Sequence, residues 1–216
     1  MCIRDRVITV PSAVAFFLFG PLITQVIFVG IPAEDSRYIG YVLSALSFGL
    51  VAFSINLILI RGFNAFEDTR TQVISIFIIN LISVVLSYLF LHFLKVQWVT
   101  IGLGLAFSIS YVVGLLITLS LLKKHTGQIK VMDFFGQHLR LFAAAFGVMT
   151  PLYVLMRYIT WLGVELSPLA RAGELLLVMV MAFLGYLLAG KAVGVEEISM
   201  IRQLRDSVVR RSSRPE

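Results

Sequence analysis

The sequence predicts an all-α integral membrane protein with six transmembrane helices. First, 59% of the 216 residues are hydrophobic and only 14% are charged, whereas soluble domains average about 45–50% and about 25%. Second, the apolar residues form six blocks close to the roughly 20 residues that cross a bilayer. Third, most Lys and Arg residues fall on one of the two sides that these blocks separate. These features exclude a soluble or disordered chain, and a single cysteine excludes an internal disulfide.

The six blocks differ in how cleanly they avoid charge. The first four contain no Asp, Glu, Lys or Arg, and they cover Val7–Ala33, Tyr38–Ile60, Thr71–Leu94 and Val96–Leu122. The fifth, at about 141–164, is interrupted by Arg157 near its far end. The sixth, at about 172–193, carries Glu174 and Lys191 near its ends. Charged side chains near a helix end can extend to the membrane interface, so both blocks are expected to span.

The distribution of basic residues predicts the orientation. Fourteen of the 18 Lys and Arg residues fall on the side that holds both chain ends. The other four are Arg37, Lys95, Arg157 and Arg171. The positive-inside rule therefore places both termini in the cytoplasm. The net charge of +6 is mainly a topology signal, so we expect contact with membrane lipids and no nucleic-acid partner.

The pattern divides the chain into five segments. Residues 1–6, which read MCIRDR, lead abruptly into the first span, and we interpret them as a truncated or artificially joined start. Residues 7–122 form a four-helix unit, and 123–140 a cytoplasmic connector with a short interfacial helix. Residues 141–195 form a transmembrane hairpin. Residues 196–216 form a basic cytoplasmic tail that is either an amphipathic surface helix or a solvated segment.

Polar and small residues inside the spans carry further information. No arrangement of a nucleophile, a His and an acid indicates an enzyme, and no ligand spacing predicts a metal site. Asn80, Ser83 and Ser87 share one helix face, which either bonds a neighbouring helix or faces a water-filled pathway or ion site. Pairs of small residues four apart predict close helix packing: Ala45/Gly49, Gly104/Ser108, Ser110/Gly114 and Ala143/Gly147.

Charged residues also gather around the last outer hairpin. They are Arg157, Glu165, Arg171 and Glu174. A surface charge cluster is the default interpretation, and contact with an anionic headgroup near a groove is the second.

The loop between the second and third spans carries a resemblance to a known family. Residues 61–71 read RGFNAFEDTRT, and they resemble the cytoplasmic loop of MurJ/MviN lipid II flippases, which typically reads R-x-F-Y-A-x-x-D-T-x-T-P. Val10-Pro-Ser-Ala-Val-Ala15 and Gly20-Pro-Leu22 also resemble that family's ninth span. The order of the later segments is similar to spans ten to fourteen. Asn64 and Gln72 replace the family's Tyr and Pro.

The resemblance implies both a fold and a function. The chain would be the C-terminal portion, about spans 9–14, of a flippase in the multidrug/oligosaccharidyl-lipid/polysaccharide exporter superfamily. Its first four helices would belong to the second lobe, followed by a C-terminal helical pair. It would move lipid II, the lipid-linked peptidoglycan precursor, across the bacterial cytoplasmic membrane by alternating access, and so support cell wall biogenesis and cell shape.

The resemblance also implies partners. These are lipid II or another polyprenyl-linked precursor, membrane lipids, and the N-terminal lobe of the same protein, where most substrate-contacting residues would lie. No cofactor is implied, although coupling to an ion or to the membrane potential stays open. Two other functions stay open as well: export of another polyprenyl-linked sugar or small molecule, and a self-contained six-span scaffold or channel.

Three candidate site regions follow from the resemblance. A cytoplasmic gate comprises Arg61, Asn64, Glu67, Asp68, Thr69, Arg70 and Thr71. Its charges either form an ion-pair network or mark a helix junction capped by Asp68 or Thr69. An intramembrane polar face comprises Asn80, Ser83 and Ser87, where relatives place an Asn-x-x-x-Asn/Asp pair linked to cations and this chain has serines. A groove for the lipid tail comprises Phe142, Phe146, Leu176, Val180 and Phe183.

Overall fold

The computed structural model describes residues 2–126, 131–161 and 168–192, and all regular structure in these residues is helical. The helices are α1 (Cys2–Ile27), α2 (Ala33–Ala65), α3 (Thr69–Phe93), α4 (Val96–Thr126), α5 (Val131–Trp161) and α6 (Pro168–Ala192). Each contains a stretch long and apolar enough to cross a membrane. The predicted all-α class with six transmembrane helices is therefore confirmed.

The first two helices depart from the predicted boundaries for local reasons. α1 ends at Ile27, six residues before the end of the charge-free block. Gly30 follows with a φ of 106°, a conformation that glycine adopts without steric cost, and Pro32 disfavours helical backbone just before it. α2 then begins at Ala33. Its first turn contains Glu34 and Asp35, because carboxylates are favoured at the positive end of the helix dipole.

The described parts of the segment expected to form a short interfacial helix belong to α4 and α5. α4 continues through the two lysines to Thr126, and α5 begins at Val131. The apolar span of α5 starts only at His138, so its first turns extend beyond the span. Leu139, expected on the apolar side of the interfacial helix, is an exposed residue of α5. The predicted tail at 196–216 lies outside the described residues.

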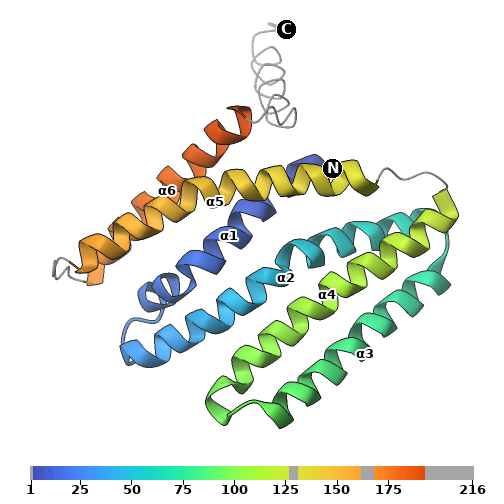
Figure 1. Ribbon diagram of the computed structural model, residues 1–216, viewed down its shortest axis with the longest axis horizontal. Coiled ribbons are helices and arrows are strands. Elements are labelled where there is room, and N and C mark those ends of the chain that lie inside the picture. The colour runs from blue at the N-terminus through green and yellow to red at the C-terminus, as the bar shows by residue number, and fades with distance from the viewer. Residues whose placement is uncertain (1, 127–130, 162–167, 193–216) are drawn as a thin grey trace, which may run out of the picture.

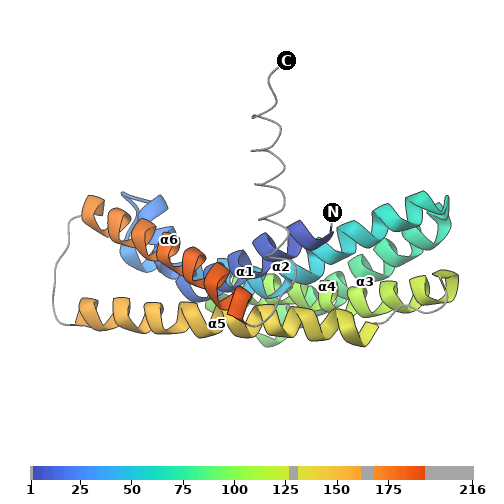
Figure 2. The same cartoon turned by 90° about the horizontal axis from the view of Figure 1, so that it is seen from above.

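The helices pack in a consistent order across the molecule. α1 contacts α2, α5 and α6; α2 contacts α4; and α4 contacts α3. Figure 1 shows α5 and α6 on one side, α3 on the other, and α1, α2 and α4 between them. Seen from above, α5 and α6 diverge toward the ends that lead into residues 162–167 (Figure 2). Where α1, α5 and α6 meet, large side chains are buried. These include Phe19, Leu141 and Tyr186.

The contacts of α2 with α1 and α4 depend on small residues. A Cβ on Gly40 would overlap the backbone of Pro21 in α1, and one on Gly49 would come within 2.5 Å of the Ser108 Cα in α4. The Ser108 hydroxyl donates to the Ala45 carbonyl at 2.6 Å. Close packing of the pairs Ala45/Gly49 and Gly104/Ser108 is thus confirmed, because these residues let the two backbones approach.

The other two small-residue pairs behave differently. Gly114 of α4 faces the Ile79 side chain of α3, so the pair Ser110/Gly114 marks a true helix contact. A Cβ on Gly147 would meet nothing within 4 Å, and Ala143 is exposed. The prediction of close packing at Ala143/Gly147 is therefore wrong.

Candidate functional site

The predicted gate residues lie at a tight turn between two helices. α2 continues through Arg61 and Asn64 to Ala65, and α3 begins at Thr69, so only residues 66–68 separate the helices. The amide of Asp68 donates to the Phe63 carbonyl at 3.1 Å. Phe63 is only 1% exposed, so it anchors the end of α2 in the protein. The turn is thus fixed by backbone bonds and one buried aromatic ring.

Asp68 caps α3. Its carboxylate accepts a hydrogen bond from the Thr71 amide at 3.0 Å, which satisfies one of the free N–H groups at the helix start. Of the two capping residues that the sequence allowed, Asp68 is therefore the one used, and Thr69 is the first helical residue. Glu67 has a φ of 57°, a left-handed conformation that is uncommon for residues other than glycine.

The remaining charges of this turn face solvent. Arg61, Glu67 and Arg70 are exposed. Within the described part of the chain, no ion pair joins any of these three to another residue. Backbone bonds and the Asp68 cap hold the turn in this conformation, and Arg61, Glu67 and Arg70 add no ion pair to it among the described residues. The charged side chains are consequently available for contacts elsewhere.

The predicted polar face lies at the edge of the contact between α3 and α4. Ser75 and Ile79 are the buried residues of α3. Ser83 and Ser87 are half-buried beside them, whereas Asn80 is exposed and its amide donates to the Ile76 carbonyl of its own helix at 2.9 Å. Asn80 thus makes no bond to a neighbouring helix among the described residues.

The predicted lipid-tail residues divide into two sets. Phe142 is half-buried against the core, and Phe146 packs edge-to-face on Phe17 of α1 with ring centroids 6.2 Å apart. Phe146 is nonetheless 38% exposed, and on α6 the side chains of Leu176, Val180 and Phe183 are more exposed still. The positions i, i+4 and i+7 place these three on one face of the helix. The structure therefore puts the α5 pair beside α1 and leaves an open apolar face on α6.

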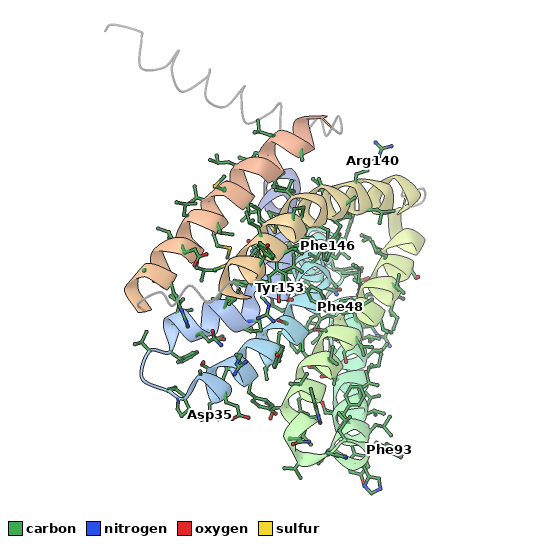
Figure 3. All side chains as sticks on the ribbon, turned by 60° about the vertical axis from the view of Figure 1, so that its left-hand side comes forward. Asp35, Phe48, Phe93, Arg140, Phe146 and Tyr153 are labelled. Atoms are coloured by element: carbon green, nitrogen blue, oxygen red, sulfur yellow. The ribbon has the colours of Figure 1, made fainter. Side chains whose placement is uncertain are left out.

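A pocket of about 560 Å³ lies between α1, α2, α5 and α6 at one end of the molecule. Figure 3 places Asp35 and Phe93 toward this end and Arg140 toward the opposite one. The charged residues that line the pocket are Arg37, Arg157, Arg171 and Glu174. The sequence had grouped only the last three, with Glu165, which lies outside the described residues. Arg37 could not be linked to them because it lies more than a hundred residues earlier in the chain.

Residues 6–193 match the family model of the lipid II flippase MurJ. The chain belongs to the MurJ family. The match includes all three candidate site regions and extends through all six helices. No curated protein matches the chain. MurJ proteins flip lipid II, a lipid-linked precursor, and are not enzymes, so this chain is a flippase protein of the bacterial cytoplasmic membrane with a lipid substrate. In the described residues, no group of three or more His, Cys, Asp or Glu could hold a metal ion.

Proposed function

We propose that this MurJ chain supplies a cytoplasmic gate and a lipid-tail surface for lipid II transport by alternating access, together with an N-terminal lobe. The match over residues 6–193 carries the proposal, because it assigns every described helix to a lipid II flippase. Alternating access requires contacts at each membrane side that break and reform between two states. The proposal assigns one such set to the turn between α2 and α3.

The proposed orientation has both termini in the cytoplasm. Fourteen of the 18 basic residues support it by the positive-inside rule. In Figure 1 the α2–α3 turn and the ends of α4 and α5 around 127–130 lie at the same end of the molecule. The four remaining basic residues belong to connections at the opposite end or to the helix ends beside them. The proposed orientation puts the turn at 66–68 on the cytoplasmic side.

The gate assignment is supported by exposed charge on a rigid turn. The Asp68 cap and the buried Phe63 fix the backbone, so the charged side chains of Arg61 and Arg70 extend from a defined position. In the cytoplasm-closed state, these charges would pair with groups on the N-terminal lobe. A pair that forms in only one state biases the equilibrium by its differential free energy.

The lipid-tail assignment is supported by the open face of α6. A polyprenyl chain is apolar, so it stays in the hydrocarbon region while the polar head crosses. Leu176 is 70% exposed, and Val180 and Phe183 share its face. Such a face can hold an apolar chain without removing polar groups from water.

The test is complementation by the full gene in a bacterium depleted of its own lipid II flippase. Asp68→Ala removes both the cap and a charge, whereas Asp68→Asn keeps a good capping residue and removes only the charge. If charge pairing operates the gate, both Asp68 variants and Arg61→Ala lose rescue at unchanged protein level. Lys95→Ala, which removes an exposed charge at the opposite end, is expected to keep rescue. Full rescue by Asp68→Asn and Arg61→Ala would remove the gate assignment.

A further inference from the structure

Three of the four basic residues on the proposed outer side line a single pocket. They come from different helices: Arg37 from α2, Arg157 from α5 and Arg171 from α6. Basic residues are under-represented on this side of membrane proteins. Three arginines from distant parts of the sequence nevertheless line this one pocket, which indicates that their positive charge binds something there.

These guanidinium groups have few partners among the described residues. Among the residues that the structure describes, neither Arg157 nor Arg171 forms an ion pair, and Glu174 forms none either. The Arg37 Nε donates to the Ala33 carbonyl at 3.3 Å. The other N–H groups of Arg37 make no hydrogen bond to the described residues. The lining residues that the structure describes include three arginines and one carboxylate, which together have a net charge of +2. Guanidinium groups bind phosphate oxygens in a planar, paired geometry.

The rest of the lining is suited to a molecule with an apolar part. Leu18, Leu22 and Val26 of α1 and Met156 of α5 supply apolar walls, and Gln25 adds a polar group. The exposed side chains of Leu176 and Leu177 follow directly on α6. The pocket volume of about 560 Å³ lies within the usual range of about 300–1,000 Å³ for small-ligand sites. A disaccharide that carries a peptide is too bulky for this space.

We propose that this pocket binds the phosphate of an anionic membrane phospholipid from the outer leaflet. Arg157 and Arg171 hold the phosphate, Arg37 adds positive charge, and the acyl chains lie along α6 on the side of the exposed Leu177, next to the face assigned to the polyprenyl tail. The bound lipid bridges the α5–α6 hairpin to the α1–α2 pair at the end where α5 and α6 diverge (Figure 2). The leaflet rests on the orientation given under the proposed function, whereas the binding itself rests only on the pocket.

The test is lipid binding to the purified protein in detergent, measured by native mass spectrometry. Phosphatidylglycerol is compared with phosphatidylethanolamine of identical acyl chains, which has the same phosphate but no net charge. The wild type is expected to prefer phosphatidylglycerol. The double variant Arg157→Gln/Arg171→Gln is expected to lose about fivefold of that preference for each arginine, the effect of roughly one favourable charge near a headgroup.

The matched control is Arg61→Gln/Arg70→Gln, which removes the same charge from exposed positions at the opposite end. It is expected to keep the preference, and Arg157→Lys/Arg171→Lys is expected to keep most of it. Equal losses in the two Gln doubles would show a net-charge effect and overturn the site, as would a wild type without preference. Full displacement by millimolar sn-glycerol 1-phosphate would assign the pocket to soluble phosphates and overturn the lipid assignment. Unchanged helix content by circular dichroism verifies folding of each variant.

The leaflet is tested separately. A Lys95→Cys variant of a Cys2→Ser background is expected to react with a membrane-impermeant maleimide from outside intact spheroplasts. Reaction only after lysis would reverse the orientation and the leaflet while leaving the lipid-binding result intact. Because binding is measured without transport, a failed complementation assay would also leave it intact.

Discussion

The contacts of α2 with α1 and α4 differ in kind from those of the α5–α6 hairpin with the rest of the molecule. Around α2, glycine and serine bring backbones together, as at Gly40 against Pro21 and Gly49 against Ser108. Phe146 of the hairpin packs edge-to-face on Phe17 of α1, and much of α6 carries large exposed apolar side chains. The two regions thus represent a tightly joined unit and a more loosely attached pair of helices.

This difference follows from the membrane as a solvent. Lipid tails are as apolar as leucine, so burying a large apolar side chain between helices gains little there. Stability comes instead from close van der Waals contact and interhelical hydrogen bonds, such as the one from Ser108 to the Ala45 carbonyl. Large apolar side chains remain free to face lipid or an apolar substrate. Surfaces that handle lipid are therefore expected away from the close contacts of α2 with α1 and α4.

The largest expected effect is on the α1–α2 contact. Gly40→Leu forces a side chain into the backbone of Pro21, which cannot move away as a flexible side chain could. We expect a loss of about 3 kcal/mol in the free energy of unfolding, the upper part of the usual range for overpacking. An SDS titration of the purified protein in mixed micelles, followed by circular dichroism, measures it.

Gly147→Leu is the matched control, because a Cβ there meets open space. It makes the same chemical change in the hairpin and is expected to leave the unfolding free energy unchanged or raised by up to about 1 kcal/mol through helix propensity. Equal destabilisation by both variants would show that the two regions are packed alike.

The sequence predicted the features that depend on local pattern. Apolar blocks located the six spans, and the sequence left Asp68 and Thr69 as possible caps of α3, of which the structure uses Asp68. It did not predict that α1 ends at Ile27, because the block continues apolar through Gly30 and only the backbone conformation ends the helix. Nor did it separate Gly49, which packs, from Gly147, which does not, since the spacing is identical.

The sequence also did not predict which distant residues lie close together in the fold. The meeting of Arg37 with Arg157 and Arg171 depends on how α2 is placed relative to the hairpin, and no spacing encodes that. The polar stripe of α3 illustrates the same limit. Periodicity put Asn80, Ser83 and Ser87 on one face, but only the packing against α4 shows that the face sits at the edge of a contact.

A smaller effect is expected for single hydrogen bonds between helices. The buried Asn56 amide of α2 donates to the Tyr111 carbonyl of α4 at 3.2 Å, so Asn56→Ala is expected to cost about 1 kcal/mol. Asn80→Ala removes the same side chain from an exposed position whose bond stays within its own helix. It is expected to change the unfolding free energy by less than about 0.3 kcal/mol. The same SDS titration measures both, and a larger cost at Asn80 would contradict the assignment of stability to the α2–α4 contact.

A small effect on stability, but a clear effect on transport, is expected at the open face of α6. Val180→Ala/Phe183→Ala shortens two exposed side chains, so the unfolding free energy should change by less than about 0.5 kcal/mol. If this face holds the polyprenyl tail, the variant loses apolar contact area during transport. Growth of the flippase-depleted strain should then slow at unchanged protein level.

Leu177→Ala/Leu184→Ala provides the control for that experiment on the same helix. These side chains are 58% and 54% exposed, and helical geometry places them about 80° around from Val180 and Phe183. Lipid solvates both faces equally, so a general loss of apolar surface affects both variants alike. A slower growth rate confined to the first variant would mark one face as a substrate surface, whereas equal growth of the two strains would leave α6 as a lipid-facing helix only. Both double variants shorten exposed side chains of the same helix, so a difference in stability cannot account for a difference in transport between them. The experiment therefore compares two faces of α6 directly.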